Sequence, residues 1–327
     1  MQNKSEIWLL LDNRPGTSSQ AIALANCSKM TQHKFYLDYN YLANLPNFTF
    51  GLDYCLSRLK NKDIFENLNY FPSYIISAGR RSALFALYLQ KQAKKQNHPS
   101  PKIIQIMHPQ LPLYLFDWVI LPSHDQKSNL PKNVLFSLGG LANFDTTKLH
   151  NISFDNNFLA KINHNKSTIA LLVGGSFAKK QNFSLEIFLQ LYQQISSIAN
   201  KMQAKLIILN SKRTSPAINN FLQQQKNIIF YNWHQSGSNY YLPTLAVADF
   251  LVITGDSVSM ISESLSTGKP VYIFNHPQIV KNKHTLFHQQ LQQKNLAQIL
   301  LPNQTTLTKY NYLPLNETQR LAKIIFH

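Results

Sequence analysis

Residues 254–263 combine a glycine, hydroxyl side chains and two carboxylates directly after an apolar run. Gly255 permits a sharp turn, and Asp256 or Ser257 can cap the helix that we expect to follow. The first amides of such a helix have no intrahelical acceptor and lie at the positive end of its dipole, so they can bind a phosphate.

Glu263 follows Asp256 by seven residues, which places both on the same face of that helix, about two turns apart. A carboxylate in this position can accept hydrogen bonds from both hydroxyls of a ribose. The segment therefore predicts a site for a nucleotide phosphate and its ribose. A capped helix with one exposed glutamate is the alternative.

Two further loops of the second half of the chain carry groups suited to phosphate. Gly174-Gly175-Ser176 follows an apolar run, and glycines let backbone amides approach an anion closely. Arg213, in Ser211-Lys212-Arg213-Thr214, has a guanidinium fork that matches phosphate geometry. A plain tight turn and a solvated basic face are the respective alternatives.

The first half of the chain offers candidate catalytic groups in loops that follow apolar runs. Asp12 can act as a general base, and Arg14 can hold an anionic acceptor. Gly79-Arg80-Arg81 occupies a corresponding loop, and His124 beside Asp125 can be held in one tautomer. The alternative for residues 12–17 is a turn in which Asp12 caps the next helix.

No metal site and no nucleic-acid motif are expected. His284 and His288 have i,i+4 spacing, but no acidic or cysteine residue lies near them in the sequence, so packed or exposed histidines are the better interpretation. Hydrolase motifs such as GxSxG and HExxH are absent from the sequence, and so are Walker A and GxGxxG loops. Nucleic-acid binding would rest on net charge alone.

Apolar runs that alternate with helical patterns position these loops, as in a parallel α/β fold. In the first half we expect strands at Ile7–Leu11, Ser73–Ser77, Lys102–Ile106, Trp118–Leu121 and Val134–Leu138. In the second half we expect them at Thr168–Val173, Lys205–Leu209, Asn227–Tyr231, Phe250–Ile253 and Val271–Phe274, the last of which would close the sheet. Residues 143–166 lose this periodicity and read as an interdomain linker.

We therefore predict an α/β chain of two Rossmann-like domains that face a cleft. The first covers residues 1–150 and carries the acceptor side; the second covers 151–310 and binds the nucleotide. Residues 311–327 hold a helix that crosses back to the first domain. The length of 327 residues agrees, because single cores rarely exceed about 250–300 residues.

The chain carries a net charge of +17, from 32 basic and 15 acidic residues. The excess is +7 in the first 150 residues and +10 in the rest, so it is spread along the chain. It favours phosphates or an anionic membrane surface as partners, and a drift toward Lys and Asn is the alternative cause. Two cysteines and apolar runs far shorter than a membrane span lead us to expect a soluble cytoplasmic protein, peripheral at most to the inner membrane face.

The ordered motifs of the chain resemble those of the elongated-mitochondria fission-factor family of plants and its bacterial relatives, which is similar to GT-B glycosyltransferases. The resemblance runs from Trp8 to Phe274, and Ser19 and Lys212 depart from it. Its motifs are Trp8–Thr17, Ser77–Arg80, Gln105–Pro109, Phe116–Val119, Pro122–Asp125, Gly174–Ser176, Ser211–Thr214, Thr254–Met260 and Thr267–Pro270.

The resemblance implies a metal-independent GT-B glycosyltransferase that needs no cofactor besides its nucleotide-sugar donor substrate. Gly175, Ser176 and Arg213 would face the donor diphosphate, with Ser257, Val258 and Ser259 at the phosphate by the helix start. Glu263 would face the ribose, and the segment Tyr231-Asn232-Trp233 would border the nucleobase. The acceptor, an envelope glycolipid or polysaccharide, would meet Asp12 and Arg14. A non-catalytic adaptor and a nucleotide-sugar epimerase are the alternatives, because plant members are described as adaptors of a fission GTPase. We expect Glu263 and Arg213 to be solvated, so that neither stabilises the fold.

Overall fold

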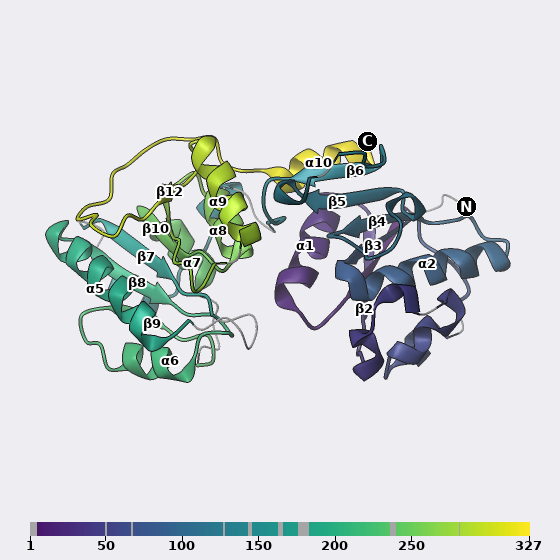
Figure 1. Ribbon diagram of the computed structural model, residues 1–327, viewed down its shortest axis with the longest axis horizontal. Coiled ribbons are helices and arrows are strands. Elements are labelled where there is room, and N and C mark those ends of the chain that lie inside the picture. Colours follow the sequence, from purple (N-terminus) through teal and green to yellow (C-terminus); the bar gives the residue numbers. More distant parts are fainter. Residues whose placement is uncertain are drawn as a thin grey trace. The chain divides into compact units, whose positions relative to one another are not determined.

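The computed structural model describes residues 5–49, 51–66, 68–126, 128–142, 146–162, 166–175, 183–235, 240–280 and 282–327. The chain divides into two compact units (Figure 1). Unit 1 comprises Met1–Asn143 and Glu317–His327, and unit 2 comprises Phe144–Asn316. Each unit contains one six-stranded parallel sheet, which confirms the predicted α/β class.

The sheet of unit 1 has the strand order β2-β1-β3-β4-β5-β6. Its strands are β1 (Glu6–Leu11), β2 (Thr31–Tyr36), β3 (Tyr74–Ala78), β4 (Lys102–Ile106), β5 (Trp118–Pro122) and β6 (Val134–Ser137). The central strands are buried on both faces, which explains their continuous apolar runs. The edge strand β2 carries polar residues and was not predicted, because it has no such run.

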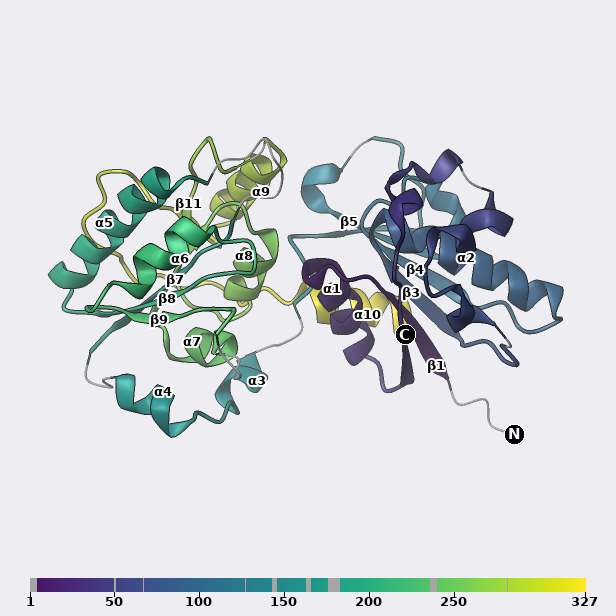
Figure 2. The same ribbon diagram turned by 90° about the horizontal axis from the view of Figure 1, so that it is seen from below.

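Helices cover both faces of this sheet. α1 (Pro15–Asn26) and the C-terminal α10 (Glu317–Phe326) pack on one face, in a cluster with Leu9, Ile76 and Ile104. Figures 1 and 2 show α10 beside α1, and the Glu317 carboxylate accepts a hydrogen bond from the Leu138 amide at 2.8 Å. α2 (Gly79–Lys95) packs on the opposite face, in the cluster with Trp8 and Ile75.

Short 3-10 helices complete unit 1. They are η1 (Tyr41–Asn44), η2 (Asn47–Thr49), η3 (Leu52–Arg58), η4 (Lys62–Phe65), η5 (Leu113–Leu115) and η6 (Ser123–Asp125).

The sheet of unit 2 has the order β12-β11-β10-β7-β8-β9, the arrangement of a classic dinucleotide-binding fold. Its strands are β7 (Thr168–Leu172), β8 (Lys205–Leu209), β9 (Ile229–Tyr231), β10 (Phe250–Thr254), β11 (Val271–Phe274) and β12 (Gln298–Ile299). The prediction that Val271–Phe274 closes the sheet is wrong, because β12 pairs with β11 outside it. A two-residue strand has too short a pattern to be recognised.

The helices of unit 2 are α3 (Thr146–His150), α4 (Asn156–Lys161), α5 (Leu185–Lys201), α6 (Pro216–Gln223), α7 (Tyr241–Val247), α8 (Val258–Leu265) and α9 (Asn282–Gln293). In this unit, α5 to α9 connect the strands, and α3 and α4 precede the first of them. α5 and α6 pack on the face that carries Ile169, Leu171 and Ile208. Among the described residues, no helix is long and apolar enough to cross a membrane.

The segment expected to be a linker belongs to unit 2. It contains α3 and α4, and α3 lies against α7 (Figure 2). Phe158 of α4 is only 1% exposed, and its ring stacks on those of Tyr231 and Tyr240, each at 5.8 Å. The interpretation as a linker was wrong because a few buried apolar residues, Leu149, Phe158 and Ile162, hold an otherwise polar segment in place, and they are too few to give a periodic pattern.

We expect Phe158→Ala to lower the free energy of unfolding by about 3 kcal/mol, the usual cost of removing a buried phenyl ring. Urea unfolding followed by circular dichroism measures this change. Asn156→Ala, an exposed position on the same helix, is the control and should leave the midpoint unchanged. Equal midpoints for both variants would contradict the anchoring role of Phe158.

Candidate functional site

The carboxyl ends of β7 and β10 define the candidate site of unit 2. These strands are hydrogen-bonded neighbours, but the chain leaves β7 toward β8 and leaves β10 toward β11, on opposite sides. Such a topological switch point is where open α/β sheets bind their ligands. The loops that meet there are residues 173–175 and 255–257, two of the segments that the sequence predicts.

The loop after β7 that contains Gly174 and Gly175, called the glycine loop below, donates hydrogen bonds from its backbone amides to residues at the end of β10 and just after it. The Gly174 amide donates to the Thr254 hydroxyl at 2.8 Å, and the Gly175 amide donates to the Asp256 carboxylate at 2.9 Å. The Gly175 amide, predicted to face the donor diphosphate, and the neighbouring Gly174 amide therefore already have protein acceptors. Ser176, the third residue of this motif, lies outside the described residues.

Close approach, and not a positive φ, explains the two glycines. A Cβ on Gly174 would lie 2.2 Å from the Asp256 carboxylate, and one on Gly175 would lie 2.0 Å from the Arg213 carbonyl oxygen. Neither neighbour can move away easily, because the one beside Gly174 is a buried carboxylate and the one beside Gly175 is backbone. The glycines thus let three loops meet at one point.

Asp256 ties this meeting point together instead of capping α8. Its carboxylate is buried and accepts hydrogen bonds from the Thr254 hydroxyl at 2.7 Å and from the Gly175 amide. Burial raises the pKa of Asp256, while these hydrogen bonds and the charge of Arg213 oppose that rise. The cap is Ser257, whose hydroxyl accepts from the Met260 amide at 3.5 Å.

Arg213 contacts the same loops. One terminal nitrogen of its guanidinium donates to the Gly175 carbonyl at 3.1 Å, and the other lies 3.5 Å from the Asp256 carboxylate. Its side chain is 29% exposed, and burial lowers its pKa. The expectation of a solvated Arg213 without a structural role is therefore wrong. Thr214 adds a hydrogen bond from its hydroxyl to the Gly174 carbonyl at 2.6 Å.

Glu263 is half-buried and accepts a hydrogen bond from the Tyr241 hydroxyl at 2.6 Å. Burial raises the pKa of Glu263 to about 7, although the hydrogen bond from Tyr241 acts in the opposite direction. The expectation that Glu263 is solvated is thus also wrong. Its carboxyl group changes charge near neutral pH, so its ability to accept two hydrogen bonds depends on pH.

Trp233 presents an aromatic face next to a rigid loop. Its side chain is 52% exposed, and its amide donates to the Asn210 side chain at 2.6 Å. Asn210 also donates to the Asn232 side chain at 2.9 Å, which joins the loops after β8 and β9. The neighbouring Tyr231 is buried and stacks on Tyr240 at 4.1 Å, so it belongs to the core.

In unit 1, Asp12 and Arg14 lie in the loop between β1 and α1. The buried Asp12 carboxylate accepts a hydrogen bond from the Arg14 amide at 2.9 Å and lies 3.9 Å from the Arg14 guanidinium. Burial raises the pKa of Asp12, and the charges of Arg14 and Arg81 counteract this. His124 is half-buried in η6. The structure thus brings Asp12 and Arg14 together.

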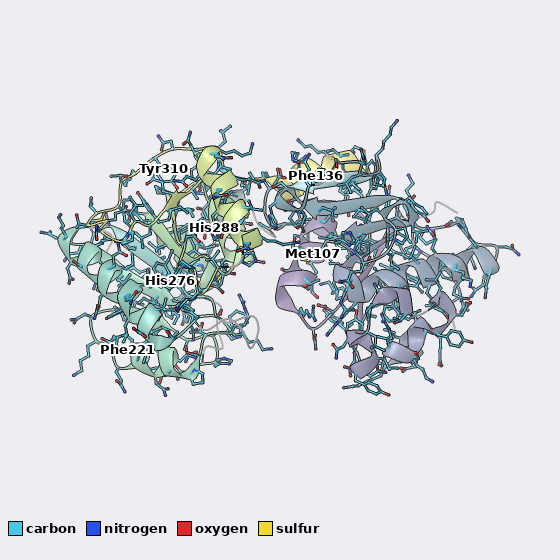
Figure 3. The ribbon with its side chains drawn as sticks, viewed as in Figure 1. Met107, Phe136, Phe221, His276, His288 and Tyr310 are labelled. Atoms are coloured by element: carbon cyan, nitrogen blue, oxygen red, sulfur yellow. The ribbon has the colours of Figure 1, made fainter. Side chains whose placement is uncertain are left out.

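The histidines predicted to be packed or exposed include a fully buried one. His288 of α9, labelled in Figure 3, is 0% exposed. Its ring lies 2.8 Å from where a Cβ of Gly255 would be. His276 stacks on Phe274 at 5.8 Å. Among the described residues, no group of three or more potential ligands is placed to hold a metal ion.

Several residues that position the site were given no such role by the sequence. Thr254 and Thr214 belong to predicted segments and hold the glycine loop, whereas Tyr241, which holds Glu263, and Tyr39, which lies beside Arg81 in unit 1, were not singled out. Nothing in the sequence pairs Tyr241 with a glutamate 22 residues later.

Two such sheets, with a switch-point site in unit 2, define the GT-B fold of glycosyltransferases and nucleotide-sugar epimerases. The chain belongs to the mitochondrial fission ELM1 family, whose model matches residues 15–327. The protein RP120 of Rickettsia prowazekii is 32% identical, over 98% of this chain and 97% of its own. The mitochondrial fission protein ELM1 of Arabidopsis thaliana is 25% identical, over 77% of this chain and 62% of its own.

Solved structures confirm the fold at low sequence identity. The UDP-GlcNAc 2-epimerase of Methanocaldococcus jannaschii, solved with UDP-GlcNAc and UDP, has a TM-score of 0.55 at 12% identity, over 98% of this chain and 99% of that one. The glycosyltransferase of kitacinnamycin has a TM-score of 0.52 at 12% identity, over 97% and 90% of the two chains. These likenesses establish the architecture and no activity.

We expect Arg213→Ala to lower the free energy of unfolding by about 2–4 kcal/mol, because it leaves the buried Asp256 carboxylate without its cation. Chemical unfolding measures the loss, and Lys212→Ala is the control at the exposed neighbour. In a double-mutant cycle, Asp256→Asn should remove much of the penalty. Additive effects of the two changes would contradict the coupling between Arg213 and Asp256.

Proposed function

We propose that this protein is a GT-B glycosyltransferase that binds a nucleotide-sugar in unit 2 and transfers its sugar to an acceptor bound by unit 1. The observation that carries the proposal is α8, which begins at the switch point and bears Glu263 about one and a half turns after its first residue, Val258. A phosphate-binding helix end and a ribose-binding carboxylate thus belong to one rigid element.

The phosphate would bind at the start of α8. The first helical amides, those of Val258 and Ser259, lie at the positive end of the helix dipole. The nearby negative charge of Asp256 would repel a phosphate, but Arg213 offsets this charge at 3.5 Å. The exposed part of the Arg213 guanidinium remains a candidate contact for the diphosphate. In this proposal Gly174 and Gly175 shape the site through their close packing.

The ribose would bind at Glu263. This residue follows Ser257 by six positions, which corresponds to roughly 9 Å along a helix, a span that suits a ribose next to its phosphates. Tyr241 occupies Oε2 of the carboxylate and fixes its orientation. The exposed ring of Trp233 would stack on the nucleobase, with its backbone held by Asn210.

Asp12 would act as the general base toward the acceptor hydroxyl, with Arg14 and His124 beside the acceptor. The raised pKa of Asp12 suits this role, because a stronger base accepts a proton more readily. Helix α8 and Arg213 would stabilise the leaving nucleoside diphosphate without a metal ion.

Two alternatives follow from specific observations. Solved structures of this fold include UDP-GlcNAc 2-epimerases, so an epimerase that uses the same nucleotide site is the first. The Arabidopsis relative is named a mitochondrial fission protein, so a non-catalytic adaptor is the second. An adaptor has no need of a glutamate with a pKa near neutrality at a helix-end site.

Calorimetry against UDP-, GDP-, ADP- and CMP-sugars tests the nucleotide site. We expect one nucleotide class to bind, and Glu263→Ala to weaken that binding about 10- to 150-fold, the equivalent of roughly 1.5–3 kcal/mol. Glu186→Gln, which removes an exposed carboxylate of unit 2, is the control. Absence of binding by every nucleotide-sugar would refute the proposal.

The affinity for the nucleotide-sugar should rise with pH. Glu263, with its pKa raised to about 7, is largely protonated at pH 6 and ionised at pH 8, and only the carboxylate accepts both ribose hydroxyls. We expect the dissociation constant to fall about 10-fold over this interval. A nucleotide-sugar is the suitable ligand because its diester phosphates do not titrate there. Glu263→Gln should remove the dependence, and an unchanged slope would assign it to another group.

Turnover distinguishes the candidate reactions. Without an acceptor, a transferase should slowly transfer the sugar to water and release the nucleoside diphosphate. An epimerase should change the sugar without a net release of nucleoside diphosphate. We expect Asp12→Asn to lower the release rate at least about 100-fold and to leave nucleotide affinity unchanged. Asp38→Asn, an exposed position of unit 1, is the control. If Asp12→Asn weakens nucleotide binding instead, its role as the base is wrong.

A further inference from the structure

Unit 1 has a topological switch point of its own, and arginines surround it. β1 and β3 are neighbours, yet the chain leaves β1 toward β2 and β3 toward β4, on opposite sides. The loop after β1 carries Arg14, and α2 begins directly after β3 with Gly79, Arg80 and Arg81. Ligands of such sheets bind at this position, outside the carboxyl ends of the strands.

The N-terminal ends of α1 and α2 meet at this point. A Cβ on Gly79, at the start of α2, would lie 3.4 Å from the Thr17 side chain in the first turn of α1. Neither first turn contains an acidic residue, and that of α2 contains two arginines. Cations are unfavourable at the positive end of a helix dipole, so this arrangement costs free energy unless an anion is bound.

Neutral groups hold the arginines of α2 in place. Arg80 donates to the carbonyl oxygens of Asn44 at 2.9 Å and Leu45 at 2.8 Å. Arg81 donates to the Asn44 side chain at 2.7 Å and lies over the ring of Tyr39, 5.5 Å from its centroid. These partners orient the guanidinium groups without cancelling their charge. Burial raises the pKa of Tyr39, so its hydroxyl stays neutral.

A buried third arginine stiffens the segment that these two contact. Arg58 is 0% exposed and donates to the Asn47 side chain at 2.7 Å and to the Leu45 carbonyl at 2.7 Å. Asn47 in turn donates to the Arg80 carbonyl at 2.6 Å. The segment that orients Arg80 and Arg81 is therefore itself fixed, as a preorganised binding site requires.

Positive charge exceeds negative charge at this point. Burial lowers the pKa of Arg81, and so do the charges of Arg14 and Arg80, while Asp12 and Tyr39 act in the other direction. The Asp12 carboxylate offsets the charge of the Arg14 guanidinium, which lies 3.9 Å away. The Arg14 amide also donates a hydrogen bond to this carboxylate and holds it in place. Among the described residues, neither Arg80 nor Arg81 forms an ion pair with a carboxylate, and Asp12 offsets the charge of Arg81 only in part.

We propose that unit 1 binds a phosphate monoester or diphosphate at the start of α1 and α2, between Arg14, Arg80 and Arg81. Guanidinium forks pair with phosphate oxygens in a bidentate manner, and the helix amides add neutral donors. This site adds a ligand class to the proposed function. It rests on that function only in identifying the phosphate-bearing ligand as the acceptor. The phosphate can belong to a lipid headgroup or to a soluble ester.

Binding of inorganic pyrophosphate, measured by calorimetry on the full chain, tests the site. We expect Arg81→Gln and Arg14→Gln each to weaken binding about 10-fold. Lys102→Gln removes an exposed cation from the amino end of β4, at the opposite edge of the same sheet, and should bind like the parent. Equal weakening by all three changes would show a general effect of net charge and overturn the proposal.

Chemical modification locates the site independently of any variant. Phenylglyoxal modifies arginines, and mass spectrometry of peptides reports each position. Pyrophosphate should slow the modification of Arg14 and Arg81 and leave Arg320, on α10, unaffected. If pyrophosphate does not slow the modification of Arg14 and Arg81, the proposal is overturned, and this outcome can be read even when the variants do not fold.

Two further ligands distinguish the source of the phosphate. Glycerol 3-phosphate represents a soluble ester, and phosphatidylcholine vesicles with a minor fraction of phosphatidic acid represent a lipid headgroup. If one of these ligands binds, and Arg81→Gln weakens that binding while Lys102→Gln does not, the result supports the site and identifies the source of the phosphate. If neither ligand binds, the proposal is overturned. Nucleotide-sugar affinity should be the same in Arg81→Gln as in the parent, so failure of this site is distinguishable from failure of the nucleotide site in unit 2.

Discussion

The buried carboxylate of Asp256 is the group on which the candidate site of unit 2 depends. It accepts hydrogen bonds from the turn that contains it and from the glycine loop, and it attracts Arg213 from the loop after β8. A buried carboxylate is costly unless it is satisfied in this way, so the three loops must adopt their positions together. Gly174 and Gly175 follow from this constraint, because any side chain there would overlap its partners. The start of α8 is placed by the same contacts.

The two units apply the same topological principle with different chemistry. In unit 2 the switch point between β7 and β10 carries one balanced ion pair and a helix start flanked by hydroxyl groups. In unit 1 the switch point between β1 and β3 carries an excess of guanidinium groups held by neutral acceptors. The first arrangement suits a nucleotide, whose recognition requires both polar and aromatic contacts. The second suits a ligand recognised mainly by its negative charge.

Membership of the mitochondrial fission ELM1 family leaves the chemistry of the site to be argued from its own residues. The Glu263 carboxyl group is informative because burial raises its pKa to about 7. A carboxylate that serves only to make a helix soluble would lie in water and keep an ordinary pKa. Keeping this group half-buried beside Tyr241 costs stability once it ionises. Groups with such shifted pKa values cluster at functional sites, which supports the proposed contact with a ribose.

The sequence by itself determined every described strand except β2 and β12, the two-sheet class and the loops that follow the predicted strands. Buried parallel strands require continuous apolar runs, and loop residues at their carboxyl ends share one edge of the sheet. β4, β8 and β11 begin and end where the sequence predicts them. The tertiary structure alone decided which loop residues serve the fold and which remain available to a ligand. Asp256 and Arg213 have side chains of the types found in binding sites. Their hydrogen bonds nevertheless join loops that are 38 to 81 residues apart in the chain. Such distant pairings depend on strand order and close backbone approach, and neither has a local pattern in the sequence.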